Sequence, residues 1–314
     1  MASLTLARRL STGSHRSKHA IFRFLSATTS PKAGSDEKEP RVVVESSNSI
    51  AEVILNRPSR LNALDLPMFH ALRDTLRNGI PSGTRCVILR GRGKSFSAGL
   101  DVKSVALSGS TSTTTELLER YPYHSPNGSA QTVNLVQDVA YGWRQLPMPV
   151  ICVIQGHCYG GGLQIALGAD LRYAAAATTQ LSVMESAYGL IPDMSASVTL
   201  RELVRMDVAK ELTFTGRVVG ANEAEQLGLV TRAVDDPLEV AREMAQQIVD
   251  KSPDAIRLAK RLYQTTWTGV DEETALQTEN DFQKELLLSW NQMAASGRKL
   301  TGLSVPYIVP KGKK

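Results

Sequence analysis

The sequence predicts an α/β protein, and three patterns support that prediction. Two short apolar runs, "CVILRG" at 86–91 and "PVICVIQG" at 149–156, end at glycine, which is typical of strands buried on both faces of a parallel sheet. Ahead of the first run, Met68, Leu72 and Leu76 stand at helical spacing. Beyond about residue 236 the chain becomes mostly helical. We therefore expect a parallel-sheet core with helices packed above and below it, followed by a helical C-terminal layer.

The first elements are expected soon after residue 40. Two β-rich runs joined by a polar turn predict a hairpin over residues 41–55. Asp65 can cap a following helix that has Pro67 in its first turn. The apolar residues of that helix recur at helical spacing, at Met68, Leu72 and Leu76.

Residues 106–130 are polar and turn-rich at both ends, which indicates a surface excursion, or a lid, rather than core. Three amphipathic helical segments follow residue 236. The expected organisation is a targeting or disordered segment at 1–40, an α/β core at 41–235 and a helical oligomerisation region at 236–314.

Composition limits the class of protein. The 314 residues are 42% hydrophobic and 21% charged, an ordinary globular balance. No stretch approaches the roughly 18 to 20 apolar residues of a membrane span, so none is predicted. The three cysteines, Cys86, Cys152 and Cys158, make no disulfide framework and indicate reduced thiols in an intracellular compartment.

The net charge of +5 is unevenly distributed. Residues 1–35 hold six basic residues and no acid, and subtracting these six from +5 leaves −1 for the remainder. A basic, Ser-rich segment without an apolar run is typical of an organellar transit peptide, and a disordered basic tail is the alternative. The C-terminal "PKGKK" is no peroxisomal signal, so the mitochondrial matrix is the expected location. Without a basic face on the remainder, no nucleic-acid partner is expected.

Three consecutive glycines, Gly160, Gly161 and Gly162, follow an apolar run and precede a helix-forming stretch. Such a turn lets backbone N–H groups at a helix N-terminus approach a negative charge, but it equally permits close packing of helix on strand. The spacing fits neither a phosphate loop nor a dinucleotide-binding fingerprint. The glycines alone leave an anion site and close packing equally open.

A second small-residue turn, in "GKSFSAGLDV" at 93–102, also follows a buried-strand candidate. Two such turns at the carboxyl ends of parallel strands would lie side by side and could present two N–H donors to one oxyanion. At this point the chain resembles the crotonase, or enoyl-CoA hydratase/isomerase, superfamily. The resemblance rests on five motifs in order: "NRPSRLNALD", "SFSAGLDV", "GHCYGGGLQIALGADLRYA", "MESAYGLIPDM" and "KELTFTGRVVGANEAEQLGLVTRAV".

The resemblance implies repeated ββα units, an acyl-CoA thioester substrate, no further cofactor and a homo-oligomer, either a trimer or a hexamer. It places the two oxyanion donors at the backbone N–H groups of Leu100 and Gly161. The substrate-binding positions that it implies are Arg60, Ala63, Ala98, Gly99 and Asp101. Arg60 could reach a CoA phosphate or be an exposed turn charge, and we expect Asp101 to fix its own turn.

The acid and base groups define the reaction. Hydratases of this family carry a glutamate two residues after the glycine triplet, where this chain has Gln164, whose amide cannot accept and return a proton near neutral pH. The second family position is matched by Glu185. Asp193 follows it after Gly189 and Pro192, which favour a bent loop that brings both carboxylates to one cleft. We therefore predict catalytic-site roles for Glu185, Asp193 and Gln164.

A glutamate followed eight residues later by an aspartate resembles the dienoyl-CoA isomerases, and also the 3-hydroxyisobutyryl-CoA hydrolases. The isomerases have a third acid where this chain has Gln164. We favour a double-bond isomerase in fatty-acid or branched-chain acyl-CoA catabolism. A 2-enoyl-CoA hydratase, a hydrolase and a CoA-binding pseudoenzyme remain alternatives. No metal site is expected, because His157, Cys152 and Cys158 lack a fourth ligand at suitable spacing.

Overall fold

The computed structural model describes residues 39–107, 111–124, 130–267 and 269–309. Residues 1–35, where we expect the targeting segment, lie outside this described part. Contacts divide the chain into Met1–Glu39 and Pro40–Lys314, and the second unit carries all the elements below.

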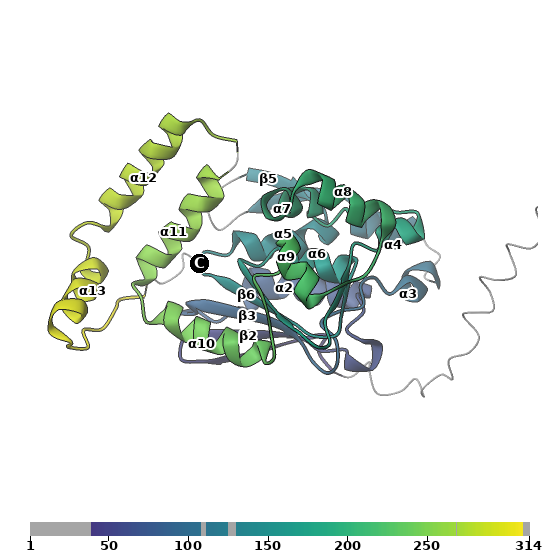
Figure 1. Cartoon of the computed structure of the whole chain (residues 1–314), viewed down its shortest axis with the longest axis horizontal. Coiled ribbons are helices and arrows are strands. Elements are labelled where there is room, and N and C mark those ends of the chain that lie inside the picture. Colours follow the sequence, from purple (N-terminus) through teal and green to yellow (C-terminus); the bar gives the residue numbers. More distant parts are fainter. Residues whose placement is uncertain (1–38, 108–110, 125–129, 268, 310–314) are drawn as a thin grey trace, which may run out of the picture. The chain divides into compact units, whose positions relative to one another are not determined.

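A six-stranded sheet lies at the centre of this unit (Figure 1). Its order is β1-β2-β3-β6-β8-β11; β1 runs antiparallel to β2 and every other neighbouring pair is parallel. The predicted hairpin and both predicted buried strands are therefore confirmed. The strands are β1 (Val42–Ser47), β2 (Ile50–Leu55), β3 (Cys86–Gly91), β6 (Val150–Ile154), β8 (Leu171–Ala175) and β11 (Arg232–Val234).

Two smaller sheets complete the strand content of the described chain. The β7, β9 and β10 strands pair in the order β10-β9-β7, and β4 pairs antiparallel with β5. The three-stranded sheet lies beside the glycine triplet, because its strand β7 ends at Tyr159. The strands are β4 (Tyr121–His124), β5 (Ala130–Val133), β7 (His157–Tyr159), β9 (Gln180–Ser182) and β10 (Val219–Gly220).

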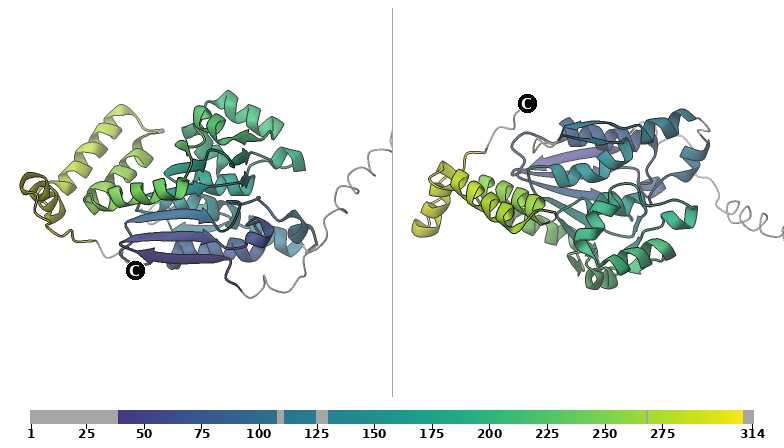
Figure 2. Two further views of the ribbon diagram at one scale, coloured as in Figure 1. Left: turned by 60° about the horizontal axis from the view of Figure 1, so that its bottom comes forward. Right: turned by 90° about the horizontal axis from the view of Figure 1, so that it is seen from above.

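Alternate residues of the central strands enter two different cores, because side chains of a strand point to opposite faces. On one face Val87 and Leu89 of β3 join helices α2 (Leu66–Asp74), α5 (Leu135–Gln145) and α6 (Gly161–Leu167). On the other face Cys86 and Ile88 pack against α10 (Pro237–Val249), which lies along the sheet in Figure 2. The sheet is thus covered on both sides, as the continuous apolar runs predict.

The helices begin where their sequence signals stand. Asp65 accepts a hydrogen bond from Met68 N at 2.9 Å, which confirms the predicted cap of α2. Asn134 and Gln137 form a reciprocal capping box at the start of α5. The helices of the core are α2 (Leu66–Asp74), α3 (Val102–Leu107), α4 (Thr111–Leu118), α5 (Leu135–Gln145), α6 (Gly161–Leu167), α7 (Ala196–Leu203), α8 (Met206–Thr215) and α9 (Ala221–Leu227). Short helical turns are η1 (Pro58–Arg60), η2 (Thr75–Gly79) and η3 (Glu185–Tyr188).

Two expectations need correction. The excursion at 106–130 is partly core, because Leu117 and Tyr123 are only 7% and 8% exposed. Its polar composition concealed these two inward-facing residues. The last amphipathic segment is two helices rather than one, since Leu288 adopts φ 63° and Ser289 caps a new helix. The C-terminal helices are α10 (Pro237–Val249), α11 (Pro253–Thr266), α12 (Glu272–Leu286) and α13 (Trp290–Thr301).

A buried lysine attaches the C-terminal helices to the core. Lys260 on α11 donates to Asp170 Oδ2 at 2.7 Å and to Met148 O at 2.9 Å. Its side chain is 6% exposed, and burial lowers its pKa although the Asp170 charge counteracts that effect. A cavity of about 650 Å³ lies beside this pair, between α11 and the core. In the described chain, α12 and α13 pack chiefly on α11 (Figure 1).

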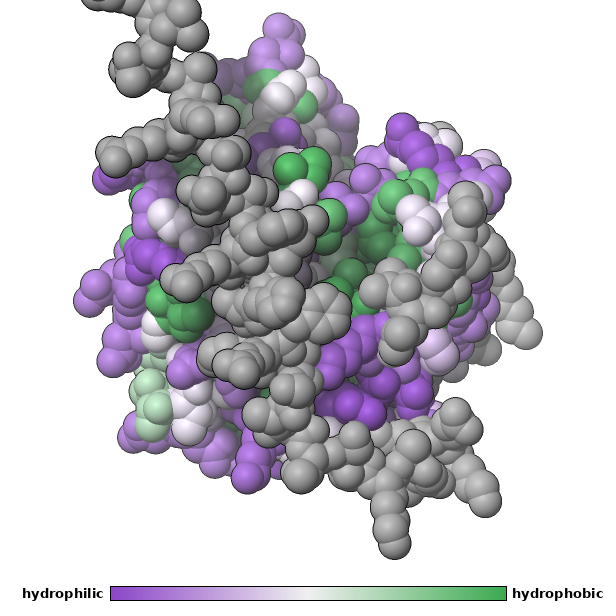
Figure 3. Space-filling model, turned by 90° about the vertical axis from the view of Figure 1, so that its right-hand side faces the viewer, coloured by the Kyte–Doolittle hydropathy of each residue, from purple (hydrophilic) through white to green (hydrophobic). Residues whose placement is uncertain are grey.

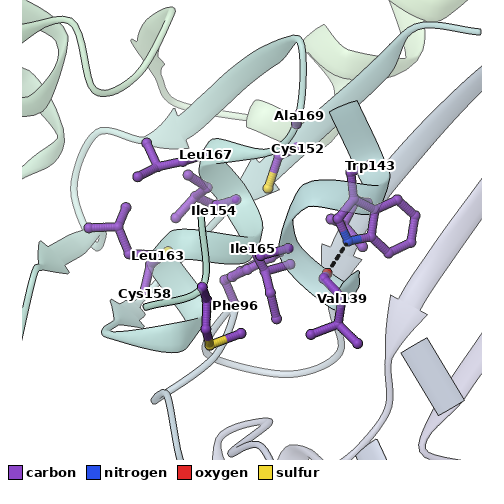
Figure 4. Close-up of a cluster of buried hydrophobic side chains, with 14 of the residues drawn as sticks. Phe96, Val139, Trp143, Cys152, Ile154, Cys158, Leu163, Ile165, Leu167 and Ala169 are labelled. Atoms are coloured by element: carbon purple, nitrogen blue, oxygen red, sulfur yellow. Dashed lines mark hydrogen bonds between the residues drawn. The ribbon is translucent and has the colours of Figure 1, made fainter. Parts of the chain in front are cut away.

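No helix in the described ranges combines the length and apolar character that crossing a bilayer requires. Cys152 and Cys158 are fully buried among apolar side chains of β6, α5 and α6, as Figure 4 shows. Burial raises the pKa of both thiols. Both are therefore packing residues of the core.

Candidate active site

Two backbone turns meet at the carboxyl ends of the central strands. The first follows β3 and contains Gly99 at φ 85°, and the second follows β7 and contains Gly160 at φ 49°. A β-carbon on Gly99 would lie 2.7 Å from Tyr159 O and 3.7 Å from Gly161 N. Only glycine permits this approach, so the two turns are in direct contact.

The two predicted oxyanion donors lie at this contact. Gly161 is the first residue of α6, where a helical N–H has no intrahelical partner. Leu100 forms an isolated bridge with Leu64, in which Gly99 O and Asp101 N make the hydrogen bonds. The N–H groups of Leu100 and Gly161 therefore make no hydrogen bond to any described residue. Two adjacent free donors are the requirement for stabilising an oxyanion.

Gln164 connects the two ends of the segment that carries the carboxylates. Its Nε2 donates to Glu185 Oε1 at 2.6 Å, and its Oε1 accepts from Met194 N at 2.8 Å. The residue is 2% exposed. Both ends of the amide are thus occupied, and the orientation of the amide is fixed by its partners.

Glu185 begins the turn η3, and Asp193 follows the exposed residues Tyr188, Leu190 and Ile191. Burial raises the pKa of Glu185, the bond from Gln164 partly offsets this, and the charge of Asp193 raises it further. Partial burial of the carboxyl group also raises the pKa of Asp193, although the residue is exposed at the surface. Gly189, at φ 70°, ends η3, so the segment from Glu185 to Asp193 is bent rather than helical, as Gly189 and Pro192 predict.

One carboxylate oxygen is left for chemistry. Glu185 Oε2 is buried and has no hydrogen-bond partner among the described residues. Neither Glu185 nor Asp193 forms an ion pair within the described ranges. A buried, unpartnered carboxylate oxygen with a raised pKa is suited to accepting a proton from a carbon acid.

The predicted substrate-binding residues surround the first turn. Asp101 accepts from Arg57 Nη1 at 2.8 Å and from Ser104 N at 3.2 Å, so it fixes its own turn. Burial raises the pKa of Asp101, but these hydrogen bonds outweigh that effect and lower it overall. Ala98 N donates to Leu61 O, and Ala63 O accepts from Arg57. Arg60 is exposed at the end of η1 and forms no ion pair with the described residues.

Residues that sequence reasoning did not single out also build the site. Met194 packs on the second turn, since a β-carbon on Gly161 would lie 2.8 Å from its Sδ. Arg57 and Asn62 are buried polar side chains below the first turn. Ser97 stands two residues before Gly99, a spacing at which a serine hydroxyl commonly accepts from the backbone, and that signal could have identified it.

Apolar surface lies among polar surface on the face that looks to the right in Figure 1, where α3 and α4 lie (Figure 3). Exposed apolar residues near the site are Leu61, Val102, Tyr188, Leu190 and Ile191. A thioester with an apolar acyl chain matches this mixture of apolar surface and backbone donors.

The fold and the two facing turns define a crotonase-type α/β protein. The family model for enoyl-CoA hydratase/isomerase matches residues 45–293, and the chain belongs to that family. A putative enoyl-CoA hydratase/isomerase of Bacillus subtilis is 36% identical over 215 residues, which are 67% of this chain and 76% of that protein.

Two further similarities agree with this assignment. The human protein named enoyl-CoA hydratase domain-containing protein 2, mitochondrial, is 32% identical over 73% of this chain and 75% of its own length. The crystal structure of enoyl-CoA hydratase from Bacillus anthracis has a TM-score of 0.73 and 28% identity, and the match covers 87% of this chain and all of that chain. The chain is thus an acyl-CoA enzyme of the enoyl-CoA hydratase/isomerase family.

Proposed function

We propose that this enzyme shifts a double bond within an acyl-CoA, as a dienoyl-CoA isomerase does. The observation that supports the proposal is the bonding of Gln164, whose amide is held at both ends and carries no transferable proton. Glu185 and Asp193 are then the two proton-transfer groups at the site. Two carboxylates whose charges interact can differ in protonation and divide the roles of base and acid.

In the proposed reaction the thioester oxygen of a 3,5-dienoyl-CoA accepts hydrogen bonds from Leu100 N and Gly161 N. Glu185 Oε2 removes a proton from C2, and the electron pair moves to the thioester oxygen as an enolate. Asp193 donates a proton to C6 as the enolate collapses, which leaves a 2,4-dienoyl-CoA. Glu185 ends protonated and Asp193 ionised, and exchange with solvent restores the starting state. Each oxyanion donor would contribute about 3 kcal/mol to lowering the barrier.

Hydration of a 2-enoyl-CoA is the second candidate, because solved structures of similar fold are named enoyl-CoA hydratases. The wild-type enzyme, Glu185→Gln and Asp193→Asn are assayed on a 3,5-dienoyl-CoA, a 2-enoyl-CoA and a 3-hydroxyacyl-CoA. We expect isomerisation by the wild type and its loss in both variants. Efficient hydration that survives Asp193→Asn would favour the hydratase, release of free CoA a hydrolase, and CoA binding without turnover a pseudoenzyme.

The proposal extends to assembly and location. The C-terminal region exposes large apolar side chains, including Leu288 between α12 and α13 and Leu300 on α13, at 83% and 84%. Such surface is normally covered by a partner, and a homotrimer or hexamer would cover it. Light scattering on the purified enzyme would measure the mass. The basic segment 1–35 and the mitochondrial name of the human relative support a mitochondrial matrix location.

A further inference from the structure

We propose that Ser97 is a positioning residue that sets the separation of the two oxyanion donors. The inference depends on the proposed function only through the oxyanion site itself. Ser97 is 0% exposed. It is not one of the predicted substrate-binding residues, which are Arg60, Ala63, Ala98, Gly99 and Asp101. Its backbone and side chain together bond to both turns of the site, and each bond can be named.

The side chain of Ser97 holds the first turn. Its Oγ accepts a hydrogen bond from Gly99 N at 3.2 Å and donates one to Asn62 O at 2.8 Å. The hydroxyl proton is committed to Asn62, which leaves the oxygen lone pairs to accept from Gly99. Because Leu100 follows Gly99 directly, the orientation of the Leu100 N–H depends on this bond.

The backbone of Ser97 holds the second turn. Ser97 N donates to His157 O at 3.0 Å, and Tyr159 N donates to Ser97 O at 3.1 Å. A β-carbon on Gly162 would lie 2.7 Å from Ser97 Cβ, so the first turn of α6 rests on this serine. The position of Gly161 N is therefore fixed relative to the same residue that orients Leu100 N.

Asn62 makes the anchor rigid. It is fully buried in the left-handed region at φ 53°, which asparagine tolerates better than most residues. Its Oδ1 accepts from Arg57 N, and its Nδ2 donates to Arg92 O and Ser95 O. Asn62, whose backbone carbonyl accepts from the Ser97 hydroxyl, is thus held in place by three hydrogen bonds of its side chain. Ser97 connects this fixed residue to the two turns that carry the donors.

The test compares Ser97→Ala with Thr179→Val. Thr179 is 3% exposed, and its Oγ1 donates to a backbone carbonyl, Ile154 O, at 3.0 Å, so it is a buried hydroxyl of similar bonding outside the site. The readout is the infrared stretching frequency of the thioester carbonyl of bound butanoyl-CoA, labelled with carbon-13 at that carbonyl. This saturated ligand has no double bond to move, so the spectrum reports the donors alone.

In the wild type we expect the carbonyl frequency to fall on binding. In Ser97→Ala the fall should be smaller, and kcat for the acyl-CoA substrate should drop about tenfold to a hundredfold with little change in KM, since losing one oxyanion donor costs about a hundredfold or more. Ser97→Cys, a weaker donor and acceptor, should lie between the two. Thr179→Val should lower the free energy of unfolding without changing the carbonyl frequency or kcat.

The outcomes distinguish a failure of the oxyanion site from a failure of the role of Ser97. A wild type that leaves the carbonyl frequency unchanged would overturn the oxyanion site and with it the proposed function. A normal shift in the wild type that persists in both Ser97→Ala and Ser97→Cys would overturn the role of Ser97 alone. A shift lost equally in Thr179→Val would also overturn it, because general loosening of the core would then explain the effect.

Discussion

Gln164→Glu is the change whose consequence follows most directly from the geometry. Gln164 Nε2 lies 2.6 Å from Glu185 Oε1, and a glutamate there would replace that donor with an oxygen. Two full charges at this separation repel by about 6 kcal/mol at an effective dielectric constant of about 20. That repulsion raises the pKa of one of the two carboxyl groups well above its ordinary value. The two carboxyl groups would therefore share one proton at neutral pH.

The shared proton changes the chemistry of the site. One protonated and one ionised carboxyl group are what addition of water to a double bond requires, so Gln164→Glu should gain hydration of a 2-enoyl-CoA. Isomerisation of a 3,5-dienoyl-CoA should weaken, because Glu185 is no longer a free base at neutral pH. Both activities are followed by absorbance between about pH 5 and pH 10, a range that should include the raised pKa of the coupled pair.

Gln226→Glu is the matched control. Gln226 is exposed on α9, so this substitution adds the same charge away from the site. It should leave both activities unchanged. The reasoning is refuted if the wild type already hydrates 2-enoyl-CoA as well as Gln164→Glu does. It is also refuted if the variant shows no new pH dependence, because the two carboxyl groups would then not be in contact.

Three further predictions concern stability and location. Burial raises the pKa of Glu185, so the stability linked to its proton is present at low pH and is lost as the pH rises through that pKa. Glu185→Gln should therefore abolish turnover yet raise the free energy of unfolding at pH 7 to 8. Below about pH 4 the variant should show no gain in that free energy. An equal gain at every pH would contradict this. Lys260→Met removes the ion-pair partner of Asp170, which keeps the hydrogen bond from Val150 N, and should lower that free energy by about 3 kcal/mol in urea titration; a neutral result would mean that solvent replaces the ion pair. Deleting residues 1–35 should leave turnover intact and abolish mitochondrial import, and a truncated protein recovered inside mitochondria would disprove the targeting role.

Local chemistry in the sequence determined the elements. The strand at 86–91, the helix cap at Asp65 and the helix start at the glycine triplet were predictable, because each depends on neighbours within a few residues. The prediction of a single helix for the third C-terminal segment was wrong. Its apolar residues keep helical spacing across Leu288, but the backbone of Leu288, at φ 63°, is not helical. Periodicity reports which residues are apolar, but not where a chain turns.

The sequence by itself also determined which residue types stand at the site: the small turns, Glu185, Asp193 and a glutamine in place of a glutamate. Only the tertiary structure decided how they are connected. Gln164 meets Glu185 across 21 residues and Met194 across 30, and Ser97 reaches Asn62 across 35. Hydrogen bonds act over about 3 Å, whereas residues so far apart in the chain have no local preference for one another. Packing of the two turns against the sheet sets these distances, and the distances decide which amide, hydroxyl and carboxyl groups act together.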